Sequence, residues 1–415
     1  MMHAALSIWI LSAVICVGRG HHHFGHTTNN DEPDQDTALD GSASSVSRVT
    51  SANTEFAFRL YRKLAAHADS QDKNIFFSPV SLSVALAALS VGARGETHQQ
   101  LFSGLGFNNT LLTQADVDQA FQTLLTRSNS NEDTSEGTAV YVDNRFKPRP
   151  EFLETLKQSY SAEGFNVDFT QTKETTDVIN QYVSEKTSGK IDKLVSDLDP
   201  STVMYLISYI YFKGKWETPF DPKLTKEDIF MVDESTKVPV QMMNEERRFD
   251  TYYDQAMNTS VLHLPFNSSY SMLLLLPDDM ATLENDISPG HVTKWLKWMK
   301  SRTYDVYIPK FSIKSSYSLA NMLSEMGMSD MFGDRADLSG IAEGQKLAVS
   351  EVVHQATLDV DEAGATAAAA TGIGITLLSF RHVPVLKFDR PFMVIITEPS
   401  TEKMLFMGKI INPTI

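Results

Sequence analysis

The stretch DEAGATAAAATGIGITLLS, at residues 361–379, is the part of the chain from which a fold is most readily predicted. Alanine-rich sequence normally favours a helix. Small and apolar residues also alternate here with a period of two, which is typical of a strand. The stretch lies between two strand-like runs, Lys346–Val360 and Val383–Phe388. We therefore predict a loop that can also become a strand of a sheet, although composition alone favours a flexible Ala/Gly connector.

The rest of the chain is predicted to form one folded unit that follows an N-terminal leader. The whole chain has 415 residues, of which 42% are hydrophobic and 21% charged, enough for a large core. No linker or repeat interrupts residues 50–415. The apolar run Ala4–Val17 is too short to span a bilayer, so residues 1–20 are predicted to be a secretory signal peptide. We predict a disordered His-rich and acidic tail over residues 21–49.

The leader and the glycosylation motifs together predict a secreted glycoprotein of the extracellular space. Removal of the signal peptide would take away Cys16, the single cysteine, and with it any disulfide or cysteine-based catalysis. In a secreted chain, N-x-S/T triplets are candidate glycosylation sites. They occur at Asn108, Asn258 and Asn267.

Charge and motifs exclude several function classes. The net charge of −16 does not suit a nucleic-acid partner, and no run after the leader suits a membrane partner. The basic cluster Lys294–Arg302 is predicted to be an amphipathic helix with a solvated lysine face, and residues 114–127 offer no strong heparin site. The histidines of the tail would bind a metal only weakly, so we predict no metal site and no cofactor. The common hydrolase, zinc-protease and nucleotide-binding motifs are missing from the sequence, and no enzyme activity is predicted.

Hydrophobic periodicity predicts helices in the first half of the chain and strands in the second, hence an α+β fold. The predicted helices are Thr54–Ala66 with Asn53 as its cap, Pro79–Leu89, Gln114–Thr126, Pro150–Tyr160, Thr175–Thr187, Leu283–Met299 and Ser318–Met326. The predicted strands are Val203–Phe212, Val261–Leu264, Met272–Leu276, Tyr304–Ile308, Leu347–Val360, Val383–Phe388, Phe392–Ile396 and Met404–Ile411.

Seven short motifs, in this order along the chain, resemble those of one protein family. They are NIFFSP at 74–79, GARGET at 92–97, IN at 179–180 with KTSGKI at 186–191, YFKGKW at 211–216, DLSGI at 337–341, FDRPF at 388–392 and FMGKIINP at 406–413. The chain resembles a serpin over essentially its whole folded length. It is most similar to the secreted α1-antitrypsin/antichymotrypsin-like branch. The resemblance implies three β-sheets, about nine helices and an exposed reactive-centre loop.

The resemblance also implies how the loop works: it baits a serine protease, which cleaves it and is trapped as a covalent acyl-enzyme. The family's loop length places the reactive bond at Leu378-Ser379, with Phe380 and Arg381 as alternative cleavage points. Leu378 suits a chymotrypsin-like protease, such as a chymase or cathepsin G, or next an elastase. We expect a monomer. The hinge of the loop corresponds to Glu362, Gly364, Ala365, Thr366, Ala367, Ala368, Ala369 and Ala370.

In serpins a polar cluster lies where the central sheet opens. The matching residues are Ser78, Ser81, Ser208, Trp216 and His354, with Ser208 standing where relatives often have Asn. Two other functions remain open at this point. One is a non-inhibitory carrier of a small hydrophobic hormone, and the other is a structural or chaperone-like matrix protein. The uninterrupted run of small residues in the hinge favours the inhibitor.

Overall fold

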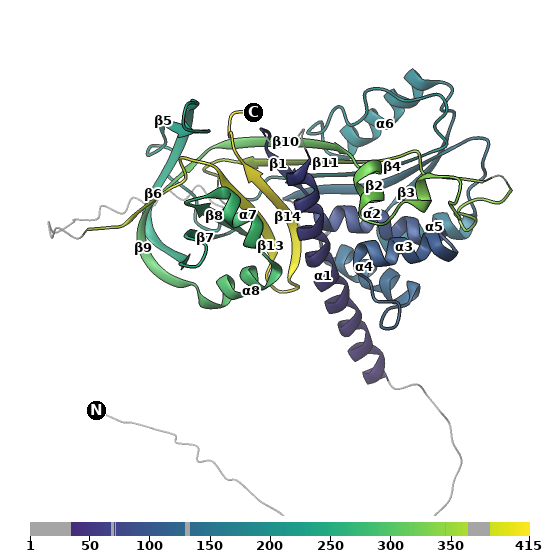
Figure 1. Ribbon diagram of the computed structural model, residues 1–415, viewed down its shortest axis with the longest axis horizontal. Helices are drawn as coiled ribbons and strands as arrows, with labels where there is room; N and C mark the ends of the chain where they lie inside the picture. Colours follow the sequence, from purple (N-terminus) through teal and green to yellow (C-terminus); the bar gives the residue numbers. More distant parts are fainter. Residues whose placement is uncertain (1–34, 68–69, 71, 129–132, 345, 364–381) are drawn as a thin grey trace, which may run out of the picture.

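The chain folds into helices packed on a five-stranded and a nine-stranded sheet, which confirms the predicted α+β class (Figure 1). The computed structural model describes residues 35–67, 70, 72–128, 133–344, 346–363 and 382–415. In this part of the chain the helices are α1 Gln35–Ala66, α2 Pro79–Gly92, α3 Gly95–Leu105, α4 Gln114–Ser128, α5 Pro150–Tyr160, α6 Thr172–Lys186, α7 Met280–Asp286, α8 Pro289–Trp298 and α9 Ala320–Glu325.

The five-stranded sheet runs in the order β10-β11-β4-β2-β3. Its strands are β2 Thr134–Asp143, β3 Glu163–Val167, β4 Met204–Phe212, β10 Phe311–Ser318 and β11 Glu351–Val360. At its centre β11 and β4 pair in parallel, from Glu351 opposite Tyr205 to Leu358 opposite Phe212. Their outer neighbours, β10 and β2, pair with them antiparallel.

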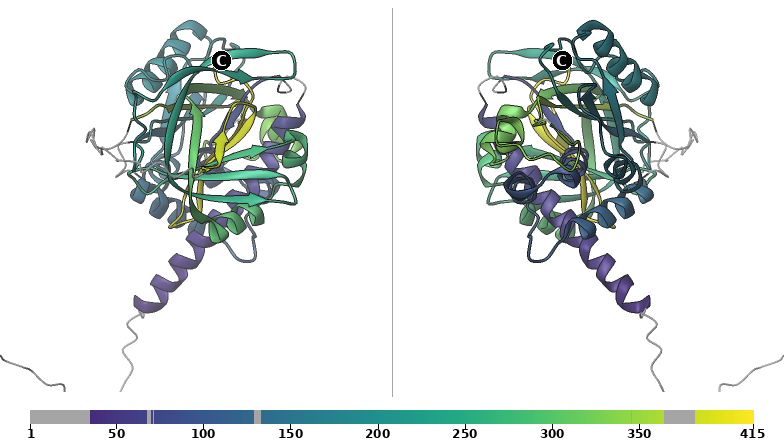
Figure 2. Two further views of the ribbon diagram at one scale, coloured as in Figure 1. Left: turned by 90° about the vertical axis from the view of Figure 1, so that its left-hand side faces the viewer. Right: turned by 90° about the vertical axis from the view of Figure 1, so that its right-hand side faces the viewer.

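Helices cover both faces of this sheet, with α6 on one side and α2 to α5 on the other (Figures 1 and 2). Val140 and Leu206 belong to the core cluster that includes α2, whereas Tyr141 and Ile207 belong to the cluster beneath α6. Successive side chains of a strand point to opposite faces. A strand buried on both faces therefore reads as a continuous apolar run, as β4 does.

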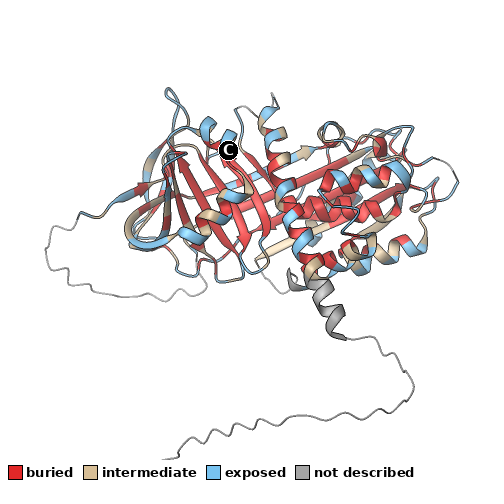
Figure 3. Cartoon of the chain, turned by 60° about the horizontal axis from the view of Figure 1, so that its bottom comes forward, coloured by how far each residue is buried: buried red, intermediate tan, exposed pale blue. Residues whose placement is uncertain are grey.

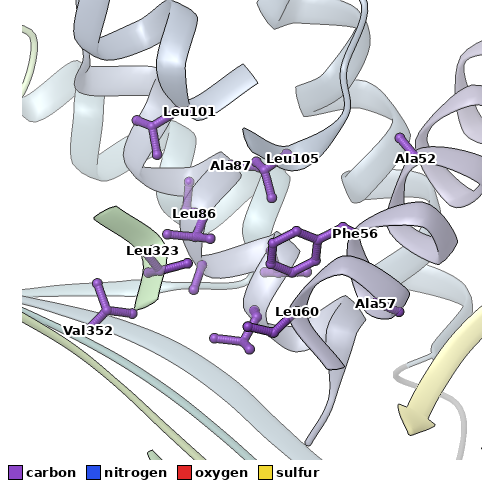
Figure 4. Close-up of a cluster of buried hydrophobic side chains, with 14 of the residues drawn as sticks. Ala52, Phe56, Ala57, Leu60, Leu86, Ala87, Leu101, Leu105, Leu323 and Val352 are labelled. Carbon is purple, nitrogen blue, oxygen red and sulfur yellow. The ribbon is translucent and has the colours of Figure 1, made fainter. Parts of the chain in front are cut away.

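The largest core cluster lies between the helices and the two sheets. Side chains from α1, α2, α3, α9 and β11 meet in it (Figure 4). Buried residues run along the inner strands of both sheets and the inner faces of the helices, while exposed residues gather on the outer turns (Figure 3). Among the described residues, no helix combines the length and apolar character that a membrane span requires.

The nine-stranded sheet follows the path β1-β14-β13-β8-β7-β6-β9-β12, with β5 added to β6. Its strands are β1 Ile75–Phe77, β5 Lys226–Met231, β6 Lys237–Asp254, β7 Thr259–Pro265, β8 Ser271–Pro277, β9 Lys300–Pro309, β12 Val385–Lys387, β13 Phe392–Glu398 and β14 Lys403–Ile410. The long strand β6 pairs with β5 and β9, and its last residues pair with β7. Strand β6 therefore joins β5, β9 and β12 to the remaining strands of this sheet. The described residues form two sheets, whereas three were expected.

The start of the folded part differs from the prediction. Helix α1 begins at Gln35 rather than Thr54, so it takes in residues assigned above to the disordered tail. Val46 and Val49 are buried, in helical register with Phe56 and Leu60 further along α1. Polar residues between these apolar positions hid the pattern. Asn53 is not a cap, because it lies inside the helix and donates to Ser83 Oγ at 2.9 Å.

Two further predictions needed correction. The predicted helix Leu283–Met299 is two helices, α7 and α8, because Pro289 starts a new helix and leaves Ser288 extended. Strand β11 begins at Glu351 rather than Leu347. The strands β1, β2, β3, β5, β6 and β10 and the helix α3 were not predicted. Charged residues interrupt the apolar pattern of β6, whose burial alternates only in part.

Candidate functional site: the junction of strands β4 and β11

A buried histidine lies at the centre of the junction between β4 and β11. His354 of β11 faces Ser208 of β4 in the register of the two strands and is 0% exposed. Its Nδ1 lies 3.0 Å from Ser208 Oγ. Its Nε2 accepts a hydrogen bond of 3.0 Å from the backbone N–H of Ser78. The imidazole therefore ties both strands to the first turn of α2.

The protonation state of His354 follows from these contacts. Because Ser78 N–H is a donor, Nε2 is the unprotonated nitrogen and Nδ1 carries the proton. Burial lowers the pKa of His354 to about 3, and a hydrogen bond that the ring donates to the Ser208 backbone opposes this shift. The side chain is neutral at physiological pH, and a charged imidazolium would disrupt the contact with Ser78.

The network continues from Ser78 to the strand on the other side of β4. Ser78 caps α2 and donates from Oγ to Ser81 Oγ at 2.9 Å. Ser81 Oγ in turn donates to Glu136 Oε2 of β2 at 3.1 Å. The structure thus brings together four of the five predicted residues, Ser78, Ser81, Ser208 and His354. It adds Glu136, which sequence reasoning missed because a lone Glu in a polar strand carries no local signal.

The fifth residue, Trp216, lies elsewhere, beside residues 361–363, which follow β11 and precede the predicted reactive-centre loop. It is 2% exposed, and its ring stacks on Phe266 with centroids 4.5 Å apart. Its Nε1 donates to the Asp361 carbonyl at 2.7 Å, and its backbone N–H donates to the Ala363 carbonyl at 3.0 Å. Trp216 therefore holds the segment 361–363, which we call the loop base.

Two ion pairs also fasten the loop base. Glu362 forms an ion pair of 2.8 Å with Lys310 and accepts from Thr225 Oγ1 at 2.7 Å. Burial raises the pKa of Glu362, but the hydrogen bonds from Lys310 and Thr225 outweigh it, so the pKa lies below its ordinary value. Asp361 forms a 2.7 Å ion pair with Lys213. Lys310 and Thr225 are distant in sequence and had no motif to mark them.

The other predicted residues fall into two groups. The hinge residues after Ala363 and the reactive bond Leu378-Ser379 lie outside the described residues. The glycosylation candidates Asn108, Asn258 and Asn267 are all exposed, so the fold leaves each of them accessible. In the described ranges no group of three or more His, Cys, Asp or Glu side chains is placed to bind a metal ion.

The strand directions define what this arrangement can do. The loop base follows the C-terminal end of β11, which pairs in parallel with β4. A segment that turned back from the loop base and entered between them would run antiparallel to both. One parallel ladder would then be replaced by two antiparallel ladders, which are slightly more stable per residue. The His354 network and the loop base lie along and at the end of this junction.

Known proteins resemble this chain over most of its length. A family model described as Serpin (serine protease inhibitor) matches residues 51–413. An alpha-1-antitrypsin-like protein of Tamias sibiricus is 40% identical over 410 residues, which cover 98% of this chain and 97% of that protein. A serine protease inhibitor of Mus musculus is 42% identical over 375 residues, with 88% and 89% covered.

Solved structures are similar over the same length. Human thyroxine-binding globulin complexed with thyroxine matches with a TM-score of 0.83 and 35% identity, covering 89% of this chain and 100% of that one. Human glycosylated kallistatin matches with a TM-score of 0.82 and 37% identity, covering 89% and 99%. The chain belongs to the serpin family, in its α1-antitrypsin/antichymotrypsin-like branch.

Proposed function

We propose that this serpin is a secreted suicide-substrate inhibitor of chymotrypsin-like serine proteases, not an enzyme. The bait is Leu378, whose large apolar side chain suits the hydrophobic specificity pocket of such proteases. A chymase or a cathepsin G-like protease is the expected target, with elastases next. The glycosylation candidates Asn108, Asn258 and Asn267 fit an extracellular monomer.

The proposed mechanism begins as ordinary proteolysis. The protease serine attacks the carbonyl carbon of Leu378, the bond to Ser379 nitrogen breaks, and the new amine leaves with residues 379–415. The protease remains esterified to Leu378. Residues 364 to about 376 then enter the sheet between β11 and β4 and carry the protease with them before water hydrolyses the ester.

The single observation that carries this proposal is the direct parallel pairing of β11 with β4, next to the anchored loop base. Insertion would add about ten backbone hydrogen bonds, each worth about 0.5–1.5 kcal/mol, so about 5–15 kcal/mol in total. Burial of Ile373 and Ile375 would add about 1.5–3 kcal/mol each. The sum rivals the whole stability of a typical domain, about 5–15 kcal/mol, so the intact state must be held by a kinetic barrier.

The test is incubation with chymotrypsin followed by denaturing electrophoresis and mass spectrometry. The expected result is an SDS-stable complex and a released fragment that begins at Ser379. A fragment beginning at His382 would move the reactive bond to Arg381 and contradict a chymotrypsin-like target.

A hinge variant tests the insertion step. Ala365→Arg places an unpaired charge on a segment that must become buried, at a cost of several kcal/mol. We expect this variant to be cleaved as a substrate without a stable complex. An undiminished yield of complex would refute the insertion mechanism.

A carrier of a small hydrophobic hormone is the second candidate. It is favoured by the similarity to thyroxine-binding globulin, whose solved structure contains thyroxine. The same incubation separates the two functions, because a carrier would be nicked by chymotrypsin and would form no covalent band.

A further inference from the structure

An exposed tyrosine lies beside the glycosylation candidate Asn258. Strands β6 and β7 form a hairpin in which Asp254 pairs with Thr259, so that residues 255–258 make the turn. Tyr253 is 55% exposed. Its Oη donates a hydrogen bond of 3.2 Å to Asn258 Oδ1. A tyrosine has a large apolar ring with one polar end, and here the polar end reaches the asparagine while the ring stays in solvent.

Tyr253 is also opposite the third residue of the same glycosylation motif. In the register of the hairpin, Tyr253 of β6 faces Ser260 of β7. Residues directly opposite each other in an antiparallel pair place their side chains on the same face of the sheet. The asparagine and the serine of the Asn258-Thr259-Ser260 motif therefore both lie next to the tyrosine, although the motif and the tyrosine belong to different parts of the hairpin.

The backbone holds Asn258 in a defined position. Its φ of 43° lies in the left-handed region, which asparagine adopts more readily than most residues. Its carbonyl accepts a hydrogen bond of 3.0 Å from the backbone N–H of Asp278, which follows β8. The Asn258 side chain is exposed and leaves room for a group attached to Nδ2.

Amide geometry decides where such a group would lie. A secondary amide is planar and strongly prefers the trans form. A sugar carbon bound to Asn258 Nδ2 is then trans to Cβ, and so lies on the same side of the amide bond as Oδ1. Since Oδ1 is the atom that Tyr253 contacts, the first sugar ring begins next to the tyrosine. The C–H groups on the face of a sugar suit the negative face of an aromatic ring.

We propose that Asn258 carries an N-linked glycan whose first N-acetylglucosamine packs on Tyr253 and stabilises the β6–β7 hairpin. In the transfer, Asn258 Nδ2 loses a proton and bonds to the anomeric carbon of a lipid-linked oligosaccharide diphosphate, from which the lipid diphosphate leaves. The proposal rests on the proposed function, because only a secreted chain meets this donor.

Occupancy of Asn258 is measured first, on the full chain secreted by mammalian cells. Enzymatic removal of N-glycans in heavy-oxygen water converts each glycosylated asparagine to an aspartate that carries the heavy isotope. Mass spectrometry of the peptides should find this label at position 258. An unlabelled Asn258 in the secreted protein would overturn the proposal.

Hydrogen exchange then tests the contact with Tyr253. Ser260→Ala removes the glycosylation motif but keeps Asn258 and Tyr253. We expect it to speed exchange of the hairpin amides by about fivefold, because the hairpin opens more often without the sugar contact. In a Tyr253→Ala background, Ser260→Ala should add little further change. Effects of the two substitutions that multiply would contradict packing of the sugar on Tyr253.

Three controls separate the sugar from the substitutions. Ser260→Thr keeps the motif and should keep the slow exchange, while Asn267→Gln removes a different glycosylation candidate and should leave the β6–β7 hairpin unchanged. In protein made in bacteria, which lacks these glycans, Ser260→Ala should have no effect on exchange. An equal effect there would assign the protection to the serine and overturn the proposal.

Tyr253→Phe distinguishes the ring from the hydroxyl. It keeps the aromatic face and should keep most of the glycan-dependent protection, and it serves in place of Tyr253→Ala if that variant does not fold. None of these measurements needs a protease. A failure to trap chymotrypsin would refute the proposed function and leave the label at Asn258 and the exchange rates as they are.

Discussion

At the scale of single residues, His354 is the most constrained group of the site. It is fully buried, and its two ring nitrogens contact α2 and β4. Replacing it would leave the Ser78 N–H and the Ser208 hydroxyl without this partner in the core. An unsatisfied buried polar group costs about 1–3 kcal/mol. The residue therefore stabilises the closed sheet more than an ordinary buried side chain would.

We expect His354→Ala to lower the barrier to sheet opening and to promote polymers on warming. Native gel electrophoresis after incubation at increasing temperatures is the measurement. His263→Ala is the matched control, because His263 is a partly buried histidine of β7 that lies outside the network. Equal polymer formation by both variants would assign the effect to general destabilisation.

The pKa of His354 also predicts a dependence on pH. Burial lowers this pKa from 6.5 to about 3, so between these values the unfolded chain binds more protons than the folded one. The contribution of His354 to the free energy of unfolding is present above pH 6.5 and is lost as the pH falls towards about 3. We expect urea midpoints at about pH 7 and about pH 5 to differ more for the unchanged protein than for His354→Gln. Equal differences would contradict the buried neutral state.

At the scale of elements, the loop base and helix α1 are held in different ways. The loop base depends on contacts between distant segments, chiefly Trp216 and Lys310 with residues 361–363. Helix α1 depends on one apolar stripe that continues through Val46 and Val49 to Phe56 and Leu60. The first arrangement can release its segment when a few contacts break, whereas the second is part of the core.

We expect Val49→Ala to reduce the free energy of unfolding by about 1–3 kcal/mol, because a buried side chain is truncated. Ser47→Ala, at an exposed position of the same turn, should change it little. Urea unfolding followed by circular dichroism is the measurement. Equal stability of the two variants would indicate that residues 44–49 belong to the disordered tail and not to the folded core.

At the scale of the whole molecule, the proposed mechanism requires that the intact fold be less stable than the cleaved one. Strands β4 and β11 pair directly in the intact protein, so a further strand could enter only if this junction opened. The chain is thus expected to fold first into a metastable state and to become more stable when the loop is cut.

We expect the thermal midpoint to rise after the loop is cleaved. Differential scanning calorimetry of intact and cleaved protein is the measurement. Cleaved Ala365→Arg is the control and should show a smaller rise, because the charge resists insertion. Coincident transitions for intact and cleaved protein would mean that no energy is stored.

Much of this could be predicted from the sequence, because the information was local. The Pro79 start of α2, the apolar run of β4 and the family motifs each lie within a few residues, and local patterns report local structure. The serpin resemblance led to Ser78, Ser81, Ser208, Trp216 and His354. It also assigned Glu362 to the hinge of the loop.

The remainder depended on contacts between residues far apart in the chain. Lys310 forms an ion pair with Glu362, and Glu136 accepts a hydrogen bond from Ser81. Nothing in the sequence near any of these residues marks its partner, since a charged side chain in a strand is usually solvated. Their roles arise because folding removes them from water, and a buried charge must then find its compensation within the protein.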